Sequence, residues 1–246
     1  MELKQYYKDN MFHKQYELSF GDCDPKGRIK ISAIMEMMSE IAGADFANRG
    51  YPYEFLLENN IVFLLSRISG KIHRTPKSDD ILTLKTWEVG TKGVSFLRYF
   101  EFYDNKQNLL VSAKSSWIMV NPHTRRPCRP SSFEFADNTH PDKDADCKDP
   151  GKIVCADMPN FVSDREIMYS DLDANGHTHN TRYGDFAIDV MPDNMRQNDI
   201  KEFKINFVSE ALLGQKIMMH TQICDNEITI IGKKDDNSCF EAQFII

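Results

Sequence analysis

Long apolar runs are missing from this sequence, and none approaches the length that a helix needs to cross a bilayer. The first ten residues, Met1 to Asn10, are largely polar and lack the apolar segment of a secretory signal. These absences argue against a membrane span and predict a cytoplasmic protein.

Paired cysteines and an excess of basic charge are also missing. The six cysteines are scattered, without a Cys-x-x-Cys pair or a matching histidine spacing, so free thiols are expected rather than zinc ligands or disulfides. The net charge of −7 argues against nucleic acid as the main partner, because phosphate binding needs a basic footprint. Two local basic stretches, residues 71–77 and 123–129, are the candidates for meeting an acidic protein.

Apolar residues are nevertheless plentiful. The chain has 246 residues, 41% of them hydrophobic and 27% charged, which is typical of a globular protein with a substantial core. That length fits one large domain or two small, similar ones.

The order of the expected elements repeats along the chain. In the first half, apolar spacing indicates a strand, then an amphipathic helix and a run of antiparallel strands, at 16–20, 31–50, 61–65, 81–89, 94–103 and 109–120. A polar stretch rich in Asp, Pro, Asn, Lys and Ser follows and indicates a linker. The same order then returns, at 165–169, 180–191, 202–209, 216–224, 227–232 and 239–246.

Two short motifs support an internal duplication. Residues 20–28 and 169–177 match at both aspartates and at the glycine, and the same elements follow each motif. The chain therefore looks like a duplicated unit of about 120 residues. We expect an N-terminal copy at 1–130, a linker at 131–160 and a C-terminal copy at 161–246.

The second motif holds the candidate catalytic residues. Asp173, Asn175 and His177 occupy alternate positions, so their side chains converge if the backbone stays extended up to Gly176. A carboxylate, an amide and an imidazole supply a base, an orienting group and a hydrogen-bond donor, which is the set that a hydrolytic site needs. Glu210, just after an alternating strand, adds a second carboxylate.

These groups are absent from the first copy. Lys26 and Arg28 stand at the positions of Asn175 and His177, and residues 75–76 (Thr-Pro) stand where Glu210 is found. If only one copy is catalytic, the sequence predicts the second.

Simpler interpretations remain open at this stage. Asp173 and Asn175 are also common turn residues, since Asx side chains cap their own backbone, and Glu210 at a strand end is usually solvated. The run also resembles the start of a calcium loop, but Arg182 stands where the bidentate glutamate of an EF-hand is required. No metal site and no cofactor are therefore predicted.

The duplicated pattern resembles the acyl-ACP thioesterases over nearly the whole chain. The second copy carries the family's Asp-Leu-Asp-x-Asn-x-His-x-x-Asn motif at 171–180. The first copy ends in a similar strand, Ser-Ser-Trp-Ile-Met-Val-Asn at 115–121, followed by Thr-Arg-Arg at 124–126. The resemblance implies an α+β fold of two tandem hotdog domains, each a long helix wrapped by a curved antiparallel sheet. The two sheets are expected to join into one.

By this resemblance Asp173, Asn175, His177 and Glu210 take the catalytic positions. We expect Glu210 with His177 to activate a water, Asn175 to position the water or the carbonyl, and Asp173 to orient that pair. A backbone N–H at the start of the following helix is a candidate for binding the oxyanion. Some members have a cysteine directly after the glutamate, whereas Ala211 here removes a cysteine nucleophile. Direct attack by a carboxylate stays open.

The acyl chain needs an apolar tunnel, and the first copy is the expected host. The predicted tunnel residues lie on one face of the long helix and on the following strand: Ile34, Met35, Met38, Ile41, Phe63 and Leu65. Methionine at helical spacing is also typical of a core, and that alternative stays open.

The implied partner is the acidic acyl carrier protein with its phosphopantetheine-linked acyl chain. Arg125, Arg126 and Arg129 are the favoured carrier-binding residues over the 71–77 stretch, because the Thr-Arg-Arg segment also carries the resemblance.

The function implied is hydrolysis of fatty acyl-ACP in a bacterial cytoplasm, by a monomer with an internal pseudo-dimer or by a homodimer. The alternatives are an acyl-CoA thioesterase or a hydratase of the hotdog superfamily, or a non-catalytic acyl-thioester sensor.

Overall fold

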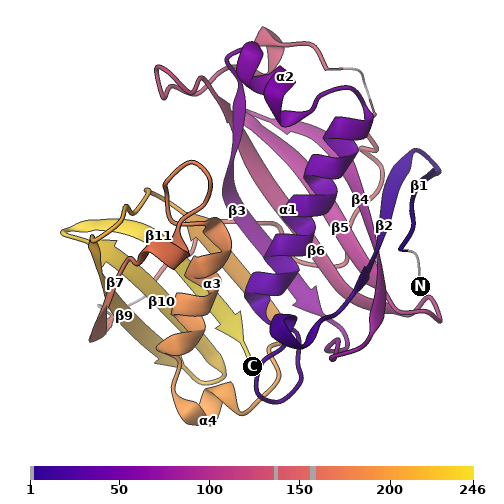
Figure 1. The fold of residues 1–246 in the computed structure, drawn as a ribbon. Coiled ribbons are helices and arrows are strands. Elements are labelled where there is room, and N and C mark those ends of the chain that lie inside the picture. The colour runs from indigo at the N-terminus through magenta and orange to yellow at the C-terminus, as the bar shows by residue number, and fades with distance from the viewer. Residues whose placement is uncertain (1–2, 136–137, 156–158) are drawn as a thin grey trace.

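The computed structural model describes residues 3–135, 138–155 and 159–246 (Figure 1). The strands are β1 Gln5–Lys8, β2 Met11–Glu17, β3 Val62–Ile72, β4 Ile81–Lys92, β5 Ser95–Tyr103, β6 Leu109–Val120, β7 Asn160–Glu166, β8 Glu202–Phe207, β9 Lys216–Cys224, β10 Glu227–Lys234 and β11 Asn237–Ile245. The α-helices are α1 Ile31–Asn48, α2 Tyr53–Glu58, α3 Asn180–Asp189 and α4 Asp193–Arg196, and short 3-10 turns lie at Phe20–Asp22, Pro130–Ser132 and Tyr169–Asp171.

All the strands belong to one antiparallel sheet in the order β1-β2-β4-β5-β6-β3-β8-β11-β10-β9-β7. Without β1, the two halves of this order mirror each other, with β2, β4, β5, β6 and β3 answered by β7, β9, β10, β11 and β8. The halves meet where β3 pairs with β8, between Arg67–Lys71 and Glu202–Asn206. The expected double hotdog and its continuous sheet are confirmed.

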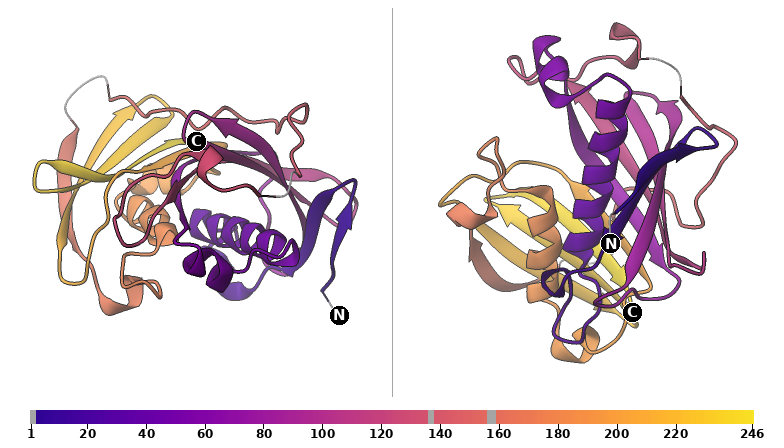
Figure 2. Two further views of the ribbon diagram at one scale, coloured as in Figure 1. Left: turned by 90° about the horizontal axis from the view of Figure 1, so that it is seen from above. Right: turned by 45° about the vertical axis from the view of Figure 1, so that its right-hand side comes forward.

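The two long helices lie side by side under the curved sheet (Figure 2). Gly184 of α3 faces α1, and a Cβ built there would lie in ordinary van der Waals contact with Sδ of Met35, at 3.5 Å. The Ser32 hydroxyl donates a hydrogen bond to Asp185 Oδ1 at 2.5 Å across the same contact. One apolar core lies between the helices and the sheet and extends through both halves of the chain. Among the described residues, no helix is long and apolar enough to cross a bilayer.

The strand that precedes each motif lies earlier in the chain than its alternation predicted. Residues 16–20 and 165–169 were expected as strands, but β2 ends at Glu17 and β7 at Glu166. In each copy an aspartate turns the chain: Asp22 Oδ2 accepts the backbone N–H of Ser19 at 2.8 Å, and Asp171 Oδ2 accepts that of Met168 at 2.9 Å. These side-chain bonds close a 3-10 turn where the apolar alternation continues.

The segment between the two halves is irregular, as its composition predicted, but it packs against the first half. The buried Lys114 ammonium of β6 pairs with Asp144 at 2.7 Å and with Asp149 at 2.9 Å, and the Trp87 indole N–H donates to the carbonyl of Lys143 at 3.3 Å. The connection is thus anchored on the N-terminal sheet. The limits at 130/131 and 160/161 stay a prediction.

Candidate active site

The motif of the second copy is a tight turn organised by one carboxylate. Asp173 Oδ1 accepts the backbone N–H groups of Asn175 at 2.8 Å and of His177 at 3.2 Å, while Gly176 takes the left-handed φ of 78°. The turn of the first copy repeats these bonds around Asp24, with distances of 2.8 and 3.0 Å. Asp173 therefore orients the amide and the imidazole through the backbone, so its turn-capping and orienting roles are the same interaction.

Glu210 reaches this turn because the residue after it is pinned to the turn. The backbone N–H and the hydroxyl of Thr178 both donate to the carbonyl of Ala211, at 3.0 and 2.8 Å. The Ala211 N–H donates to the Tyr183 hydroxyl oxygen at 3.2 Å, and burial raises the pKa of this phenol to about 12, so it stays protonated. The result places Glu210 Oε2 3.5 Å from His177 Nε2.

Arg125 joins this pair from the first half of the chain. Its guanidinium forms an ion pair with Glu210 Oε2. Asn121 shapes the turn that carries Arg125, since its side-chain oxygen accepts the N–H groups of His123 and Thr124 at 3.0 and 2.9 Å. A residue predicted to meet a carrier protein thus lies at the proposed catalytic carboxylate.

Tyr53 contacts a polar residue of the second-copy motif, and the sequence reasoning did not single it out. It begins α2, and its hydroxyl donates to Asn175 Oδ1 at 3.1 Å. The Arg-Gly-Tyr-Pro segment before it signals a helix start, with Pro52 at the N-cap, but it gives no sign of what the helix faces. The distance between residues 53 and 175 in the sequence hides the contact.

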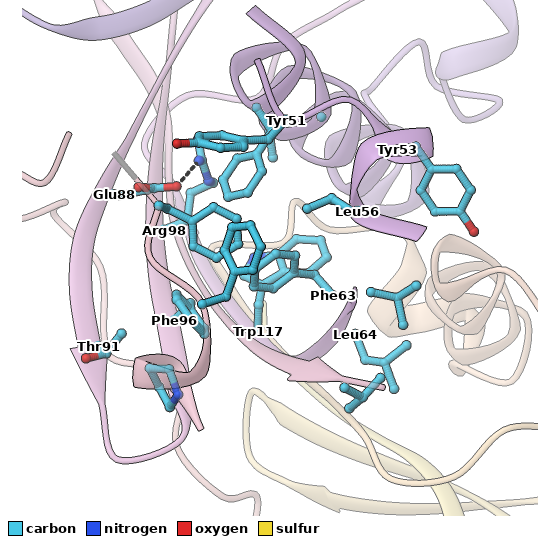
Figure 3. A pocket seen from close by; sticks show the side chains of 18 of the residues that line it. Tyr51, Tyr53, Leu56, Phe63, Leu64, Glu88, Thr91, Phe96, Arg98 and Trp117 are labelled. Carbon is cyan, nitrogen blue, oxygen red and sulfur yellow. Dashed lines mark hydrogen bonds and ion pairs between the residues drawn. The ribbon is translucent and has the colours of Figure 1, made fainter. Parts of the chain in front are cut away.

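A large pocket of about 1810 Å³ connects these groups with the first half of the chain (Figure 3). Asn175, His177 and Glu210 line it together with Tyr53 and Arg125. Much of the rest of its wall is aromatic and comes from the N-terminal half: Phe46, Tyr51, Phe63, Phe96, Trp117, Phe133 and Phe135. The pocket therefore joins a polar corner to an apolar lining that suits a hydrocarbon chain.

A buried ionic cluster also borders the pocket. Arg98, only 4% exposed, binds Asp45 at 2.8 Å and Glu88 at 2.6 Å, and Arg49 lies 3.1 Å from the same glutamate. Arg98 and Glu88 line the pocket, and Figure 3 shows their ion pair beside Tyr51. The positive charges of Arg49 and Arg98 are balanced here by the negative charges of Asp45 and Glu88.

The predicted acyl-binding face of α1 lies elsewhere. Ile34, Met35, Met38 and Ile41 are all buried in the central core, and none of them lines the pocket. The stretch of α1 that lines it is nearer the C-terminal end of the helix: Ser39, Ala42, Gly43, Ala44, Phe46 and Ala47. Helical spacing grouped the four side chains correctly on one face, but spacing alone does not tell whether that face meets a core or a cavity.

Of the two strand residues predicted to line the acyl tunnel, one lines the pocket and the other does not. Phe63 lines the pocket, whereas Leu65 does not and its neighbour Leu64 does. A register shift in the pairing of β3 with β6 lies between Leu65 and Arg67 and ends the regular alternation there.

The start of α3 is not placed to bind an oxyanion. Its residues do not line the pocket, and the N–H groups of Thr178 and His179 are already bonded to the carbonyls of Ala211 and Asp171, at 3.0 and 2.8 Å. The expectation of a helix N–H in this role is therefore unsupported. In the described part of the second half, only Asn175, His177 and Glu210 line the pocket.

At the corresponding corner of the first copy, the arginine of the turn contacts the second half of the chain. Arg28 donates from Nε to Asp24 at 2.8 Å, from Nη1 to the carbonyl of Asn198 at 2.6 Å and from Nη2 to that of Arg196 at 2.9 Å. Here the turn motif fastens the first half to the α4 region of the second half. The same turn thus carries a polar pocket corner in one copy and an interdomain clamp in the other.

The two candidate basic patches differ in their pairing. In the 71–77 stretch, Lys71 pairs with Asp146 at 2.9 Å and Arg74 pairs with Asp104. Arg126 and Arg129 are exposed, and no ion pair is recorded for either within the described residues. Arg129 lines the pocket, so this basic group borders its opening to solvent.

Comparison with known proteins identifies both halves of the chain. The model of the acyl-ACP thioesterase N-terminal domain matches residues 9–132, and that of the C-terminal domain matches residues 157–243. The dodecanoyl-[acyl-carrier-protein] hydrolase of Cinnamomum camphora is 23% identical over 229 residues, which make up 87% of this chain and 59% of that protein. The chain thus spans a little over half the length of this curated relative.

Solved structures share the fold over nearly the full chain. An acyl-ACP thioesterase from Bacteroides thetaiotaomicron superposes with a TM-score of 0.88 at 23% identity, over 96% of this chain and 98% of that one. The 12:0-ACP thioesterase from Umbellularia californica gives a TM-score of 0.81 at 16% identity, over 98% of both chains. With both of its halves matched by the family's domain models, the chain belongs to the acyl-ACP thioesterase family.

Proposed function

We propose that this protein hydrolyses the thioester of fatty acyl-ACP and releases free fatty acid and holo-ACP. The observation that carries the proposal is the juxtaposition of Asn175, His177 and Glu210 at the polar corner of a large, aromatic-lined pocket. A fatty acyl chain fits the apolar lining, and its thioester reaches the three polar groups. Membership of the family supports this assignment.

The geometry suggests how the groups share the reaction. Glu210 and His177, 3.5 Å apart, form the base that takes a proton from water as its oxygen attacks the thioester carbon. The carbonyl oxygen becomes anionic and needs a donor, which Asn175 can supply. When the tetrahedral intermediate collapses, the C–S bond breaks, and the proton held by the base neutralises the phosphopantetheine thiolate.

Arg125 has two proposed roles, one at Glu210 and one in binding the carrier protein. Its charge holds the Glu210 carboxylate in place at the pocket, and it belongs to the basic group with Arg126 and Arg129. An acyl carrier protein is strongly acidic, so a chain with a net charge of −7 needs such a local basic surface for docking. We assign the carrier surface to these three arginines.

The choice between carrier and coenzyme A is tested by one comparison. Hydrolysis of acyl-ACP and acyl-CoA of equal chain length is measured side by side, with His177→Ala as the control for catalysis at this site. Faster turnover of acyl-ACP, lost in the variant, is the expected result. Preference for acyl-CoA indicates a coenzyme A thioesterase, and turnover of neither indicates a non-catalytic sensor.

The identity of the nucleophile is tested separately. Label in an enzyme carboxylate after a single turnover in ¹⁸O water identifies carboxylate attack, because hydrolysis of the anhydride at its enzyme-side carbonyl leaves a water oxygen on the enzyme, whereas direct water attack labels only the fatty acid. The role in fatty acid biosynthesis, the bacterial and cytoplasmic setting and the monomeric or dimeric state stay predictions from the sequence.

A further inference from the structure

The hydrogen bond between Tyr53 and Asn175 joins the two copies at the proposed catalytic corner. Tyr53 lies on α2 of the first half and Asn175 in the turn of the second, 122 residues apart in the sequence. The phenol lines the pocket, and Figure 3 labels this residue, which begins α2. The catalytic turn is therefore completed by a side chain from the copy that lacks the catalytic groups.

This bond determines which end of the amide is available to a substrate. A side-chain amide has one acceptor oxygen and one donor NH₂ group. The Asn175 side-chain oxygen accepts a hydrogen bond from the Tyr53 hydroxyl. No hydrogen bond from Asn175 Nδ2 to another described residue is found. The backbone N–H of Asn175 is held by Asp173, so the main chain of the turn is fixed and only rotation of the side-chain amide exchanges its two ends, which the bond from Tyr53 opposes.

We propose that Tyr53 is a positioning residue that holds the Asn175 amide with its NH₂ group toward the pocket, where Nδ2 donates to the thioester carbonyl oxygen. This inference rests on the proposed thioester hydrolysis and assigns a single role to Asn175, which sequence reasoning left between water and carbonyl. The geometry supports this role, because the start of α3, the expected source of a helix N–H for the oxyanion, does not line the pocket whereas Asn175 does.

The first copy shows that the contact is not a general feature of the turn. Lys26 stands at the position of Asn175, and its ammonium donates to the backbone carbonyl of Gln197 at 2.8 Å. That contact involves neither a tyrosine hydroxyl nor a side-chain amide, unlike the contact of Tyr53 with Asn175. The Tyr53 hydroxyl is thus matched to an asparagine that only the second copy has.

A double-mutant cycle tests the proposal. Asn175→Ala removes the donor and should lower kcat by about 10²–10³. Tyr53→Phe removes one neutral hydrogen bond and should lower kcat by about 3- to 10-fold with KM nearly unchanged. In the Asn175→Ala background the Tyr53→Phe change should cost less than about 2-fold, because the phenol then has no amide to orient.

Two further variants separate orientation from packing. Asn175→Asp keeps an oxygen for the Tyr53 hydroxyl but cannot donate, so it should lose as much activity as Asn175→Ala. Tyr169→Phe removes a hydroxyl from an exposed tyrosine outside the pocket and should leave both kcat and KM unchanged.

The outcomes distinguish this inference from the proposed function. Absence of acyl-thioester hydrolysis by the unmodified protein overturns the function and the inference together. Hydrolysis in which the losses of Tyr53→Phe and Asn175→Ala multiply independently, or in which Asn175→Asp stays active, overturns the inference alone.

Discussion

Substituting the equivalent position in each turn should separate activity from stability. Arg28 and His177 occupy the same place in the two motifs, but Arg28 clamps the two halves of the chain together while His177 faces the pocket. We expect Arg28→Ala to keep kcat and lose stability. His177→Ala should lose kcat by about 10²–10⁴ and keep its stability.

The size of the Arg28 effect follows from its contacts. The side chain is 17% exposed and donates to Asp24 and to the carbonyls of Asn198 and Arg196, whereas its pair with the 62% exposed Asp199 adds little. Loss of these half-buried, charge-assisted bonds should cost about 2–3 kcal/mol of unfolding free energy. For a chain of this size that corresponds to a fall in Tm of about 4–12 °C.

The stability lost in Arg28→Ala should also depend on pH. Burial alone raises the pKa of the Asp24 carboxyl, but hydrogen bonds from Arg28 and two backbone N–H groups outweigh it and hold this pKa below its usual value. A depressed folded-state pKa contributes stability above the unfolded pKa of about 3.9, and that stability is lost as the pH falls through the folded value. The Tm difference between the unmodified protein and Arg28→Ala should therefore narrow below about pH 4.

Thermal unfolding across this pH range and steady-state acyl-ACP hydrolysis at neutral pH give the two readouts for each variant. A His177→Ala protein that keeps its activity contradicts the assignment of catalysis to the second copy. An Arg28→Ala protein that is fully folded but inactive contradicts the assignment of a purely structural role to the turn of the first copy. An Arg28→Ala protein with an unchanged Tm refutes the clamp.

Four other predictions concern the pocket helix, the acyl chain length, the carrier protein and the thiols. Gly43 lines the pocket within α1 and has open space at its Cβ, so Gly43→Ala should raise stability by about 0.5–1 kcal/mol, measured by denaturant unfolding. Gly43→Leu should shift the released fatty acids toward shorter chains, measured by product analysis. Charge reversal at Arg126 and Arg129 should raise KM for acyl-ACP and leave acyl-CoA hydrolysis nearly intact, and equal losses on both substrates count against docking there. Replacing all six cysteines, with alanine at the buried Cys23 and Cys239, should spare activity, whereas a folded but inactive product contradicts a thiol-independent mechanism.

The fold was largely readable from the sequence because its signals are local and repeated. The alternation of the strands, the helical spacing of α1 and the paired turn motifs each depend on neighbouring residues. The ends of β2 and β7 were misplaced because Asp22 and Asp171 close 3-10 turns through side-chain bonds, which apolar alternation does not reveal. β1, α2 and α4 are too short to show a period.

The site could be predicted only in part from the sequence, because some of its contacts join residues from the two halves of the chain. Asp173, Asn175 and His177 follow from one short motif, and Glu210 from its comparison with the first copy. The contacts of Arg125 with Glu210 and of Tyr53 with Asn175 depend on how the two halves meet at β3 and β8. The wall of the pocket likewise depends on which face of α1 the core takes.

The central claim is that Glu210 of the second copy provides the base for a single active site in each chain. Its most direct test is kcat for purified acyl-ACP with Glu210→Gln, beside Thr75→Val at the equivalent position of the first copy. We expect Glu210→Gln to lower kcat by about 10²–10⁴ without a change in fold, and Thr75→Val to leave it unchanged. A folded Glu210→Gln protein that keeps more than about a tenth of the normal kcat contradicts the claim.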